Sequence, residues 1–185
     1  REVILREIDR GGQVYFVHNR VQTLAMTAAH LAELIPEARI RIGHGQMDQG
    51  QLEKVMLAFV NGDFDVLVCT TIIESGIDIP AANTIIIDDA PYYGLTQLHQ
   101  LRGRVGRSGN RAYAYLLYRP GKPLTADAQE RLETIGSHTD LGSGLKIAMK
   151  DLELRGAGNL LGPEQSGHIA AVGFDLYVQM LAAAV

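Results

Sequence analysis

The sequence predicts an α/β fold in which a parallel sheet is covered by helices. Short β-branched runs alternate with helical patterns through the first two thirds of the chain, which is typical of βα units rather than of a bundle or a sandwich. The run at residues 84–87 is apolar on both faces, as is typical of a central strand covered on each side. The expected strands are residues 14–17, 39–42, 66–69, 84–87 and 113–117.

The spacing of apolar residues predicts the helices. Apolar side chains repeat at helical intervals over residues 21–35 and 52–60, and both helices are expected to cover the sheet. After Arg119 the alternation of strands and helices stops, because two prolines and a glycine stand close together. Thr125 can cap a following helix, and another helix is expected over about residues 145–154.

The break after Arg119 predicts how the chain is organised. We expect a sheet domain over residues 1–120 and a helical appendage over residues 121–185, closed by an apolar stripe at residues 174–185. The chain begins at Arg1 with neither an initiating Met nor a signal peptide. We therefore expect it to be part of a longer protein.

Composition identifies no partner by itself. There are 17 Lys and Arg against 21 Asp and Glu, and the resulting net charge of −4 is too small for a basic nucleic-acid arm or an acidic tail. No apolar stretch approaches the roughly 18 residues of a membrane span. Cys69 is the single cysteine, so an internal disulfide is excluded. It lies in an apolar run, where a thiol usually packs as a small apolar group, and we expect a protein of the reducing cytoplasm.

The charges are unevenly distributed along the chain. Residues 55–101 contain six acids and no Lys or Arg, whereas residues 99–122 contain six cations and no acid. In the second stretch a glycine directly precedes both Arg104 and Arg107, so that two guanidinium groups can project toward one point. This pattern suits phosphate oxygens, and the alternative is a solvated basic turn.

A resemblance to superfamily 2 helicases is carried by the string Gln100-Leu101-Arg102-Gly103-Arg104-Val105-Gly106-Arg107. It is similar to the sixth motif of that superfamily, whose arginines reach across a cleft to the γ-phosphate of ATP on a neighbouring RecA-like lobe. The resemblance implies that this chain is the second RecA-like lobe. It also implies that Arg104 and Arg107 are catalytic arginine fingers and that Gln100 lies near ATP.

Residues 70–80, which follow an expected strand, resemble the fifth motif of the same superfamily. By that match Thr70 and Thr71 contact nucleic acid, whereas Gly76 and Asp78 face the nucleotide. The alternative from the residues themselves is that Thr70 is a helix N-cap and Asp78 a turn former.

Two more polar loops follow expected strands, where parallel sheets place their sites. His18, Asn19 and Arg20 resemble the fourth motif, and the loop with His44 and Gln46 resembles one that touches the sugar-phosphate backbone. Donors of these kinds bond phosphate without reading sequence, so the resemblance implies DNA contacts. Taken singly, His18 is more often a satisfied loop histidine.

Metal and covalent chemistry are not predicted. The six histidines lack ligand spacing, and one cysteine allows no Cys-x-x-Cys pair. Asp88 and Asp89 end a strand and could take Mg²⁺, but the sequence has no Gly-x-x-x-x-Gly-Lys-Ser/Thr phosphate loop. We therefore expect ATP and Mg²⁺ to be held mainly by a first lobe outside this chain, and the chain alone to be inactive.

Residues 151–168 restrict the resemblance to two families within superfamily 2. They are similar to the translocation motif shared by RecG-type fork-reversal helicases and the transcription-repair coupling factors, and residues 168–177 favour the latter family. Matched residue by residue, Arg131, Arg155 and Gln165 are positions that couple the ATP cleft to duplex DNA. The alternative is that Arg155 only complements a helix dipole.

The resemblance as a whole implies a motor lobe of an ATP-dependent translocase on double-stranded DNA. Such a protein displaces stalled RNA polymerase and couples transcription to nucleotide excision repair. The implied partners are duplex DNA, the first lobe of the same protein and, through other domains, RNA polymerase and excision-repair proteins. A RecG-like fork-remodelling lobe and a non-catalytic, regulatory DNA-binding module are the two alternatives.

Overall fold

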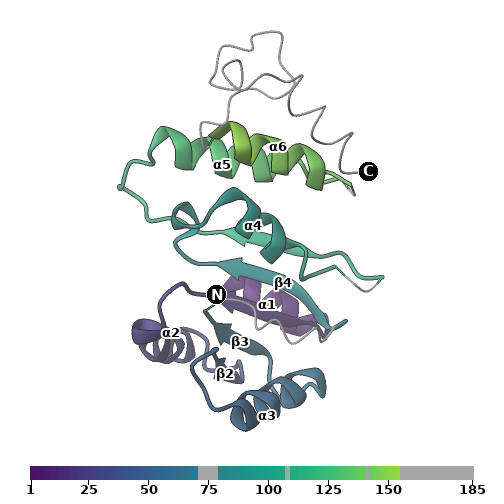
Figure 1. Ribbon diagram of the computed structural model, residues 1–185. Coiled ribbons are helices and arrows are strands. Elements are labelled where there is room, and N and C mark those ends of the chain that lie inside the picture. The colour runs from purple at the N-terminus through teal and green to yellow at the C-terminus, as the bar shows by residue number, and fades with distance from the viewer. Residues whose placement is uncertain (71–78, 107–108, 141, 155–185) are drawn as a thin grey trace. The chain divides into compact units, whose positions relative to one another are not determined.

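The computed structural model describes residues 1–70, 79–106, 109–140 and 142–154 (Figure 1). The chain divides into two compact units. The first unit comprises residues 1–93 and 100–123, and the second comprises residues 94–99 and 124–185. The domain boundary expected after residue 120 stays a prediction.

The first unit contains a parallel sheet of five strands in the order β2-β3-β1-β4-β5. Every strand predicted from the sequence is present to within two residues at each end, which confirms the α/β fold class. The strands are β1 Gln13–Val17, β2 Ile40–Gly43, β3 Val66–Cys69, β4 Ala82–Ile87 and β5 Tyr113–Leu116. The three central strands are buried along their whole length, whereas β2 and β5 are partly exposed, as the edge strands of a sheet are.

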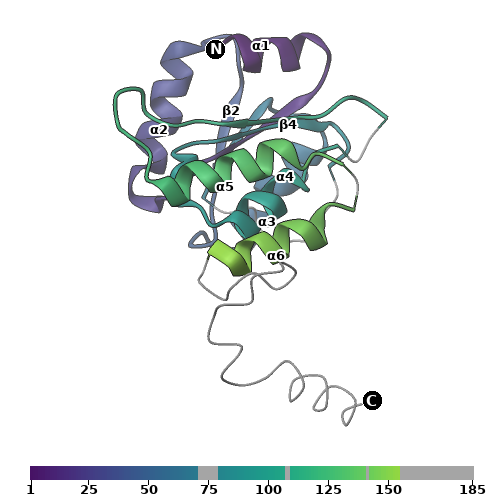
Figure 2. The ribbon, with the colours of Figure 1, turned by 90° about the horizontal axis from the view of Figure 1, so that it is seen from above.

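Helices cover both faces of this sheet. Helices α1 (Glu2–Asp9) and α2 (Val21–Leu34) share one apolar core with alternate residues of β1 and β3. Helix α3 (Gln49–Val60) covers the other face, where the ring of Phe59 packs edge-on to Tyr15 at a centroid distance of 5.3 Å. Figure 2 shows α1 and α2 on one side of the strands and α3 on the other.

The sequence prediction did not include α1. Four of its eight residues are apolar and contribute to the core, namely Val3, Ile4, Leu5 and Ile8, and Glu7 is also fully buried. The segment is shorter than the window of about 11 to 18 residues over which helical periodicity is judged.

Two helices of the second unit follow the sequence prediction closely. Helix α5 (Ala126–Ser137) starts at Thr125, whose side chain accepts a hydrogen bond from the Ala128 N–H at 3.2 Å. Helix α6 (Gly144–Leu154) packs against α5. Helix α4 (Leu95–Arg102) begins in the second unit and ends in the first. The apolar stripe expected at residues 174–185 lies outside the described residues.

Candidate nucleic-acid and nucleotide site

The five strands end in register, which brings the loops after them to one edge of the sheet. Val17 at the end of β1 lies opposite both Cys69 and Ile87. The last residues of the two outer strands are level with these, through the pairs Gly43 with Cys69 and Leu116 with Ile87. We call the residues that directly follow the strands the carboxyl edge: residues 18–20, 44–46, 70, 88–89 and 117–119. In open parallel sheets ligands bind at this edge.

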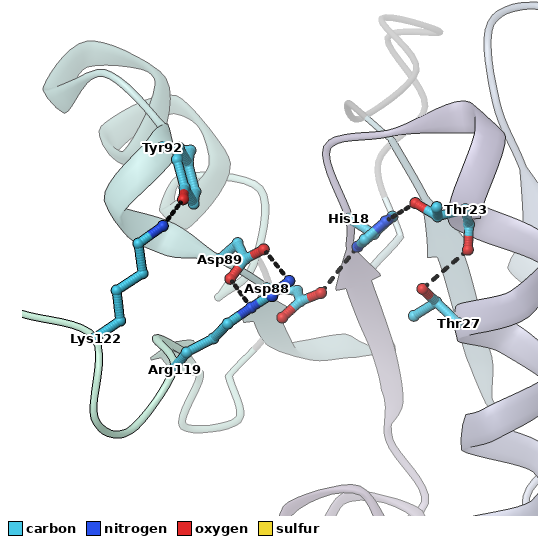
Figure 3. A network of polar contacts seen from close by, with 8 residues as sticks. All are labelled: His18, Thr23, Thr27, Asp88, Asp89, Tyr92, Arg119 and Lys122. Carbon is cyan, nitrogen blue, oxygen red and sulfur yellow. Dashed lines mark hydrogen bonds and ion pairs between the residues drawn. The ribbon is translucent and has the colours of Figure 1, made fainter.

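His18 is the first residue after β1, and hydrogen bonds hold its ring at both nitrogens (Figure 3). Its Nδ1 lies 2.8 Å from Oδ2 of Asp88, and its Nε2 lies 2.7 Å from Oγ1 of Thr23. The residue is 8% exposed. This is the geometry of a satisfied loop histidine that joins the ends of β1 and β4 to α2. Its predicted contact with DNA stays a prediction.

Asn19 and Arg20 continue this loop, and both are exposed. Arg20 is the N-cap of α2, and its own side chain makes no capping hydrogen bond. Helix N-termini favour anions. The predicted pair of Asn19 and Arg20 therefore lies at the start of a helix, where a negative charge is favoured.

The loop after β2 carries His44 and Gln46. The His44 ring is partly buried, and its Nδ1 accepts a hydrogen bond from the Gln46 N–H at 3.3 Å. A neutral ring that accepts at Nδ1 carries its proton on Nε2, which makes Nε2 a donor. The Gln46 side chain is exposed. Just beyond, Asp48 caps α3 by accepting hydrogen bonds from two backbone N–H groups, of Gly50 and Gln51.

Thr70 directly follows β3 and is buried. Because β3 lies between β2 and β1, Thr70 stands between His44 and His18 in the row of strand ends. The preceding residue, Cys69, is buried, and burial raises the pKa of its thiol to about 12, so it is no nucleophile at neutral pH. The remaining predicted residues of this segment lie outside the described residues: Thr71, Gly76 and Asp78.

Asp88 and Asp89 at the end of β4 are engaged by other side chains. Asp88 contacts the His18 ring, and Asp89 forms a bidentate ion pair with Arg119, with N–O distances of 3.1 and 3.0 Å. Within the described residues no group of three or more His, Cys, Asp or Glu side chains forms a metal site. The pairing of Asp89 was not foreseen, because its partner lies 30 residues away in the sequence.

The arginine string begins on the last turn of α4. Gln100 is exposed. Burial lowers the pKa of Arg102, but the usual pKa of an arginine is so high that Arg102 stays a cation. After the helix the Arg104 N–H donates to the Leu101 carbonyl at 3.1 Å, which fixes the backbone of a partly buried Arg104. Gly106 has φ +84°, a conformation that favours glycine. Arg107 lies outside the described residues.

The three predicted coupling residues belong to the second unit. Arg131 lies on α5 and is partly buried. Arg155 and Gln165 lie outside the described residues.

In the parts of the chain that the structure describes, no helix combines the length and apolar character needed to cross a membrane.

Curated proteins are similar to this chain over its whole length. The transcription-repair-coupling factor of Escherichia coli strain K12 is 61% identical over 185 residues, and that of Bacillus subtilis strain 168 is 57% identical over 185 residues. The chain spans only 16% of the length of each of these two relatives. These similarities confirm the resemblance found in the sequence.

Solved structures give the same fold. RecG bound to a three-way DNA junction matches 98% of this chain and 23% of its own, with a TM-score of 0.75 and 36% identity. The second domain of the DEAD-box helicase Mss116p, bound to an RNA duplex, matches 83% of this chain and 60% of its own, with a TM-score of 0.58. At 16% identity the second match shows the fold alone.

The match to a protein family covers four of the five strands and the arginine string. Residues 1–109 match the helicase conserved C-terminal domain. This segment is more than half of the chain, and it contains four strand ends of the carboxyl edge together with Gln100 and Arg104. The chain therefore belongs to the family of helicase conserved C-terminal domains.

Proposed function

We propose that this chain is the second motor lobe of an ATP-dependent translocase on double-stranded DNA, one that displaces stalled RNA polymerase and couples transcription to nucleotide excision repair. The observation that carries the proposal is similarity to transcription-repair-coupling factors over the whole of this chain, at 56 to 61% identity. We further propose that the intact protein works in the cytoplasm and meets RNA polymerase and excision-repair proteins through other domains.

The DNA contacts that we propose lie on the half of the carboxyl edge formed by β2, β3 and β1. Exposed amide and guanidinium groups of Asn19, Arg20 and Gln46, with the Nε2 donor of His44, suit a phosphate backbone. Phosphate contacts of this kind position a protein on DNA without reading its sequence. A translocase must pass over every sequence, so backbone contacts are the kind it needs. We propose His18, Thr70 and Thr71 as further members of this set.

The nucleotide contacts that we propose come from the arginine string. Arg104 and Arg107 would neutralise charge that develops on the γ-phosphate, an effect worth about 10³ to 10⁵ in rate in other phosphoryl-transfer systems. Gly76, Asp78 and Gln100 complete the proposed nucleotide side. ATP and Mg²⁺ would be held mainly by a first RecA-like lobe, because the sequence of this chain lacks the phosphate loop. The chain alone should therefore not hydrolyse ATP.

Coupling of hydrolysis to movement is proposed for Arg131, Arg155 and Gln165. Variants Arg155→Ala and Gln165→Ala in the intact protein are expected to keep ATPase activity and lose movement, measured by displacement of a triplex-forming strand from duplex DNA. Unchanged strand displacement would remove these two residues from the coupling role.

The central experiment replaces the arginines one at a time in the intact protein. Arg104→Ala and Arg107→Ala should each reduce DNA-stimulated ATP hydrolysis by about 10³ or more and abolish ATP-driven displacement of stalled polymerase. DNA binding should stay within about threefold of wild type. The matched control is Lys54→Ala, which removes an exposed cation from α3. Equal loss of ATPase activity and DNA binding would instead indicate a phosphate-backbone or folding role for the arginines.

A RecG-like fork-remodelling lobe is the second candidate function. It is favoured by the match to RecG bound to a three-way DNA junction, with a TM-score of 0.75. The two functions separate when the intact protein is given two substrates, a stalled transcription complex and a model replication fork. Displacement of polymerase without fork reversal supports the first candidate, and the reverse supports the second. Absence of ATP hydrolysis on either substrate would indicate a regulatory DNA-binding module.

A further inference from the structure

Two four-residue turns face each other beyond the ends of β4 and β5. The first covers residues 89–92, where Asp89 is the N-cap of the short 3₁₀ helix η1 (Ala90–Tyr92), and is closed by a hydrogen bond from the Tyr92 N–H to the Asp89 carbonyl at 3.0 Å. The second covers residues 119–122 and is closed in the same way, from the Lys122 N–H to the Arg119 carbonyl at 3.4 Å. Pro120 followed by Gly121 at φ +82° makes this a type II turn.

Side chains join the two turns at both ends (Figure 3). Asp89 accepts two hydrogen bonds from the Arg119 guanidinium, and the Lys122 ammonium donates to the Tyr92 hydroxyl. Lys122 Nζ also lies 5.1 Å from the centre of the Tyr92 ring. We call these four residues the clip: Asp89, Tyr92, Arg119 and Lys122. The backbone between them is bonded as well, because the Ala90 N–H donates to the Leu117 carbonyl at 2.8 Å.

The clip stands at two of the points where the chain passes from the first unit to the second. The first unit ends at Tyr93 and again at Pro123, so each passage comes one residue after the clip. The first passage leads into α4, which carries the start of the arginine string. The second leads through Thr125 into α5, which carries Arg131. Asp89 and Tyr92 lie just before α4, and Arg119 and Lys122 lie just before the segment that leads to α5. The contacts of the clip therefore join these two connecting segments to each other.

Stability alone does not account for the clip. The Arg119 side chain is 74% exposed, and ion pairs that reach solvent contribute little to stability because water competes for both charges. Asp89 has φ +49°, and holding a residue other than glycine in the left-handed region is itself unfavourable. The pair therefore adds little net stability, whereas a bidentate guanidinium and carboxylate fix the relative direction of the two backbones.

We propose that Asp89 and Arg119 are positioning residues that fix the direction in which the chain leaves the first unit at Pro123, so that movement driven by ATP reaches the coupling helices. The proposal rests on the proposed function. Neither residue is among the ATP or DNA contacts proposed above, so their loss should change how much movement each ATP produces rather than how fast ATP is hydrolysed.

The test uses the intact protein with the variants Asp89→Asn, Arg119→Gln and the double variant. Asn tolerates the left-handed backbone, so Asp89→Asn removes the charge and keeps the turn. We expect ATPase activity within about twofold of wild type and base pairs moved per ATP reduced about threefold or more. If the two residues act as a unit, the double variant should be no worse than either single variant.

The matched control is Arg39→Gln. It removes another solvent-reaching bidentate pair of the same unit, between Arg39 and Asp65, at N–O distances of 3.1 and 2.7 Å. Its side chains are 59% and 13% exposed, against 74% and 14% for Arg119 and Asp89. If losing any surface ion pair lowers the movement per ATP, Arg39→Gln should lower it as much as Asp89→Asn and Arg119→Gln do. That result would overturn the proposal.

Two further readouts separate failure of the clip from failure of the proposed function. Gly121→Ala strains the second turn without changing a charge, and we expect it to lower movement per ATP in the same direction as the charge variants. Hydrogen exchange of residues 117–123 in the intact protein should become about threefold faster or more in Asp89→Asn, whether or not the protein moves on DNA. Unchanged exchange, or unchanged movement per ATP in an active protein, would overturn the clip. A wild-type protein that does not move along DNA would overturn the proposed function, and the clip's coupling role with it.

Discussion

The two edges of the sheet use polar residues in opposite ways. At the amino edge, where β1 and β4 begin, the side chains of Glu7 and Gln13 are buried and form hydrogen bonds to side chains and to the backbone, while one oxygen of each has no partner among the described residues. At the carboxyl edge, the loops after β1 and β2 present exposed amide and guanidinium groups. The same parallel sheet thus buries polar side chains at one end, whereas its other end combines paired side chains with exposed ones.

Glu7 illustrates the amino edge. It is 2% exposed and accepts hydrogen bonds from the Thr84 hydroxyl and from Arg10, the latter at 2.6 Å. Next to it, the Gln13 amide donates to the carbonyls of Phe59 and Phe64, both at 2.8 Å. These partners offset part of the cost of burying a carboxylate and an amide, because leaving such a group wholly unpaired costs about 1 to 3 kcal/mol or more. Oε1 of Glu7 and Oε1 of Gln13 are buried without a hydrogen-bond partner among the described residues.

The largest effect is expected from Gly12→Ala at the amino edge. A Cβ at this position would lie 1.7 Å from Oε1 of Glu7, and that carboxylate is held in place by Arg10 and Thr84. Overpacking of this kind typically costs 1 to 3 kcal/mol, and displacing a buried carboxylate adds to it, so we expect a loss of about 3 kcal/mol. Urea denaturation of the chain measures it.

The matched control is Gly45→Ala at the carboxyl edge. A Cβ at Gly45 meets no atom within 4 Å, so we expect a change within about 0.5 kcal/mol. Equal losses at the two glycines would contradict the contrast between the two edges.

Periodicity was enough to predict the strands and the helices between them. An apolar run such as residues 84–87 is buried on both faces wherever it lies in a sheet, so its environment can be inferred locally. The same reasoning predicts that the loops after the strands lie at one edge, because parallel strands end there. His44 and Arg20 lie at that edge, and their contacts with DNA stay predictions.

Partners that are distant in the sequence could not be predicted. Asp89 was considered as a Mg²⁺ ligand, but it pairs with Arg119, which becomes a neighbour only when β5 is placed beside β4. Glu7 reads as a surface residue of a charged segment, and only the docking of α1 on the sheet buries it. Pairing of charges depends on tertiary structure, which a local pattern does not contain.

An intermediate effect is expected from His18→Ala at the carboxyl edge, where the ring is hydrogen-bonded at both nitrogens. Truncation removes both ring hydrogen bonds and leaves Asp88 and the Thr23 hydroxyl without this partner. Because Asp88 is 31% exposed at its side chain, water can replace part of the loss, and we expect a cost of about 1 to 2 kcal/mol. If His18 is structural, DNA affinity measured under native conditions should change less than twofold. A loss of affinity with no loss of stability would instead support the direct DNA contact.

The smallest effect on stability, with the clearest effect on binding, is expected from Arg20→Gln. Its side chain is exposed and no described residue forms an ion pair with it, so unfolding free energy should change by less than about 0.5 kcal/mol. If Arg20 contacts one phosphate, DNA affinity of the intact protein should fall about equally for all sequences. The slope of log affinity against log salt should become shallower by about one, because one fewer counterion is released. An unchanged slope would place Arg20 away from the DNA and remove it from the proposed set of DNA contacts.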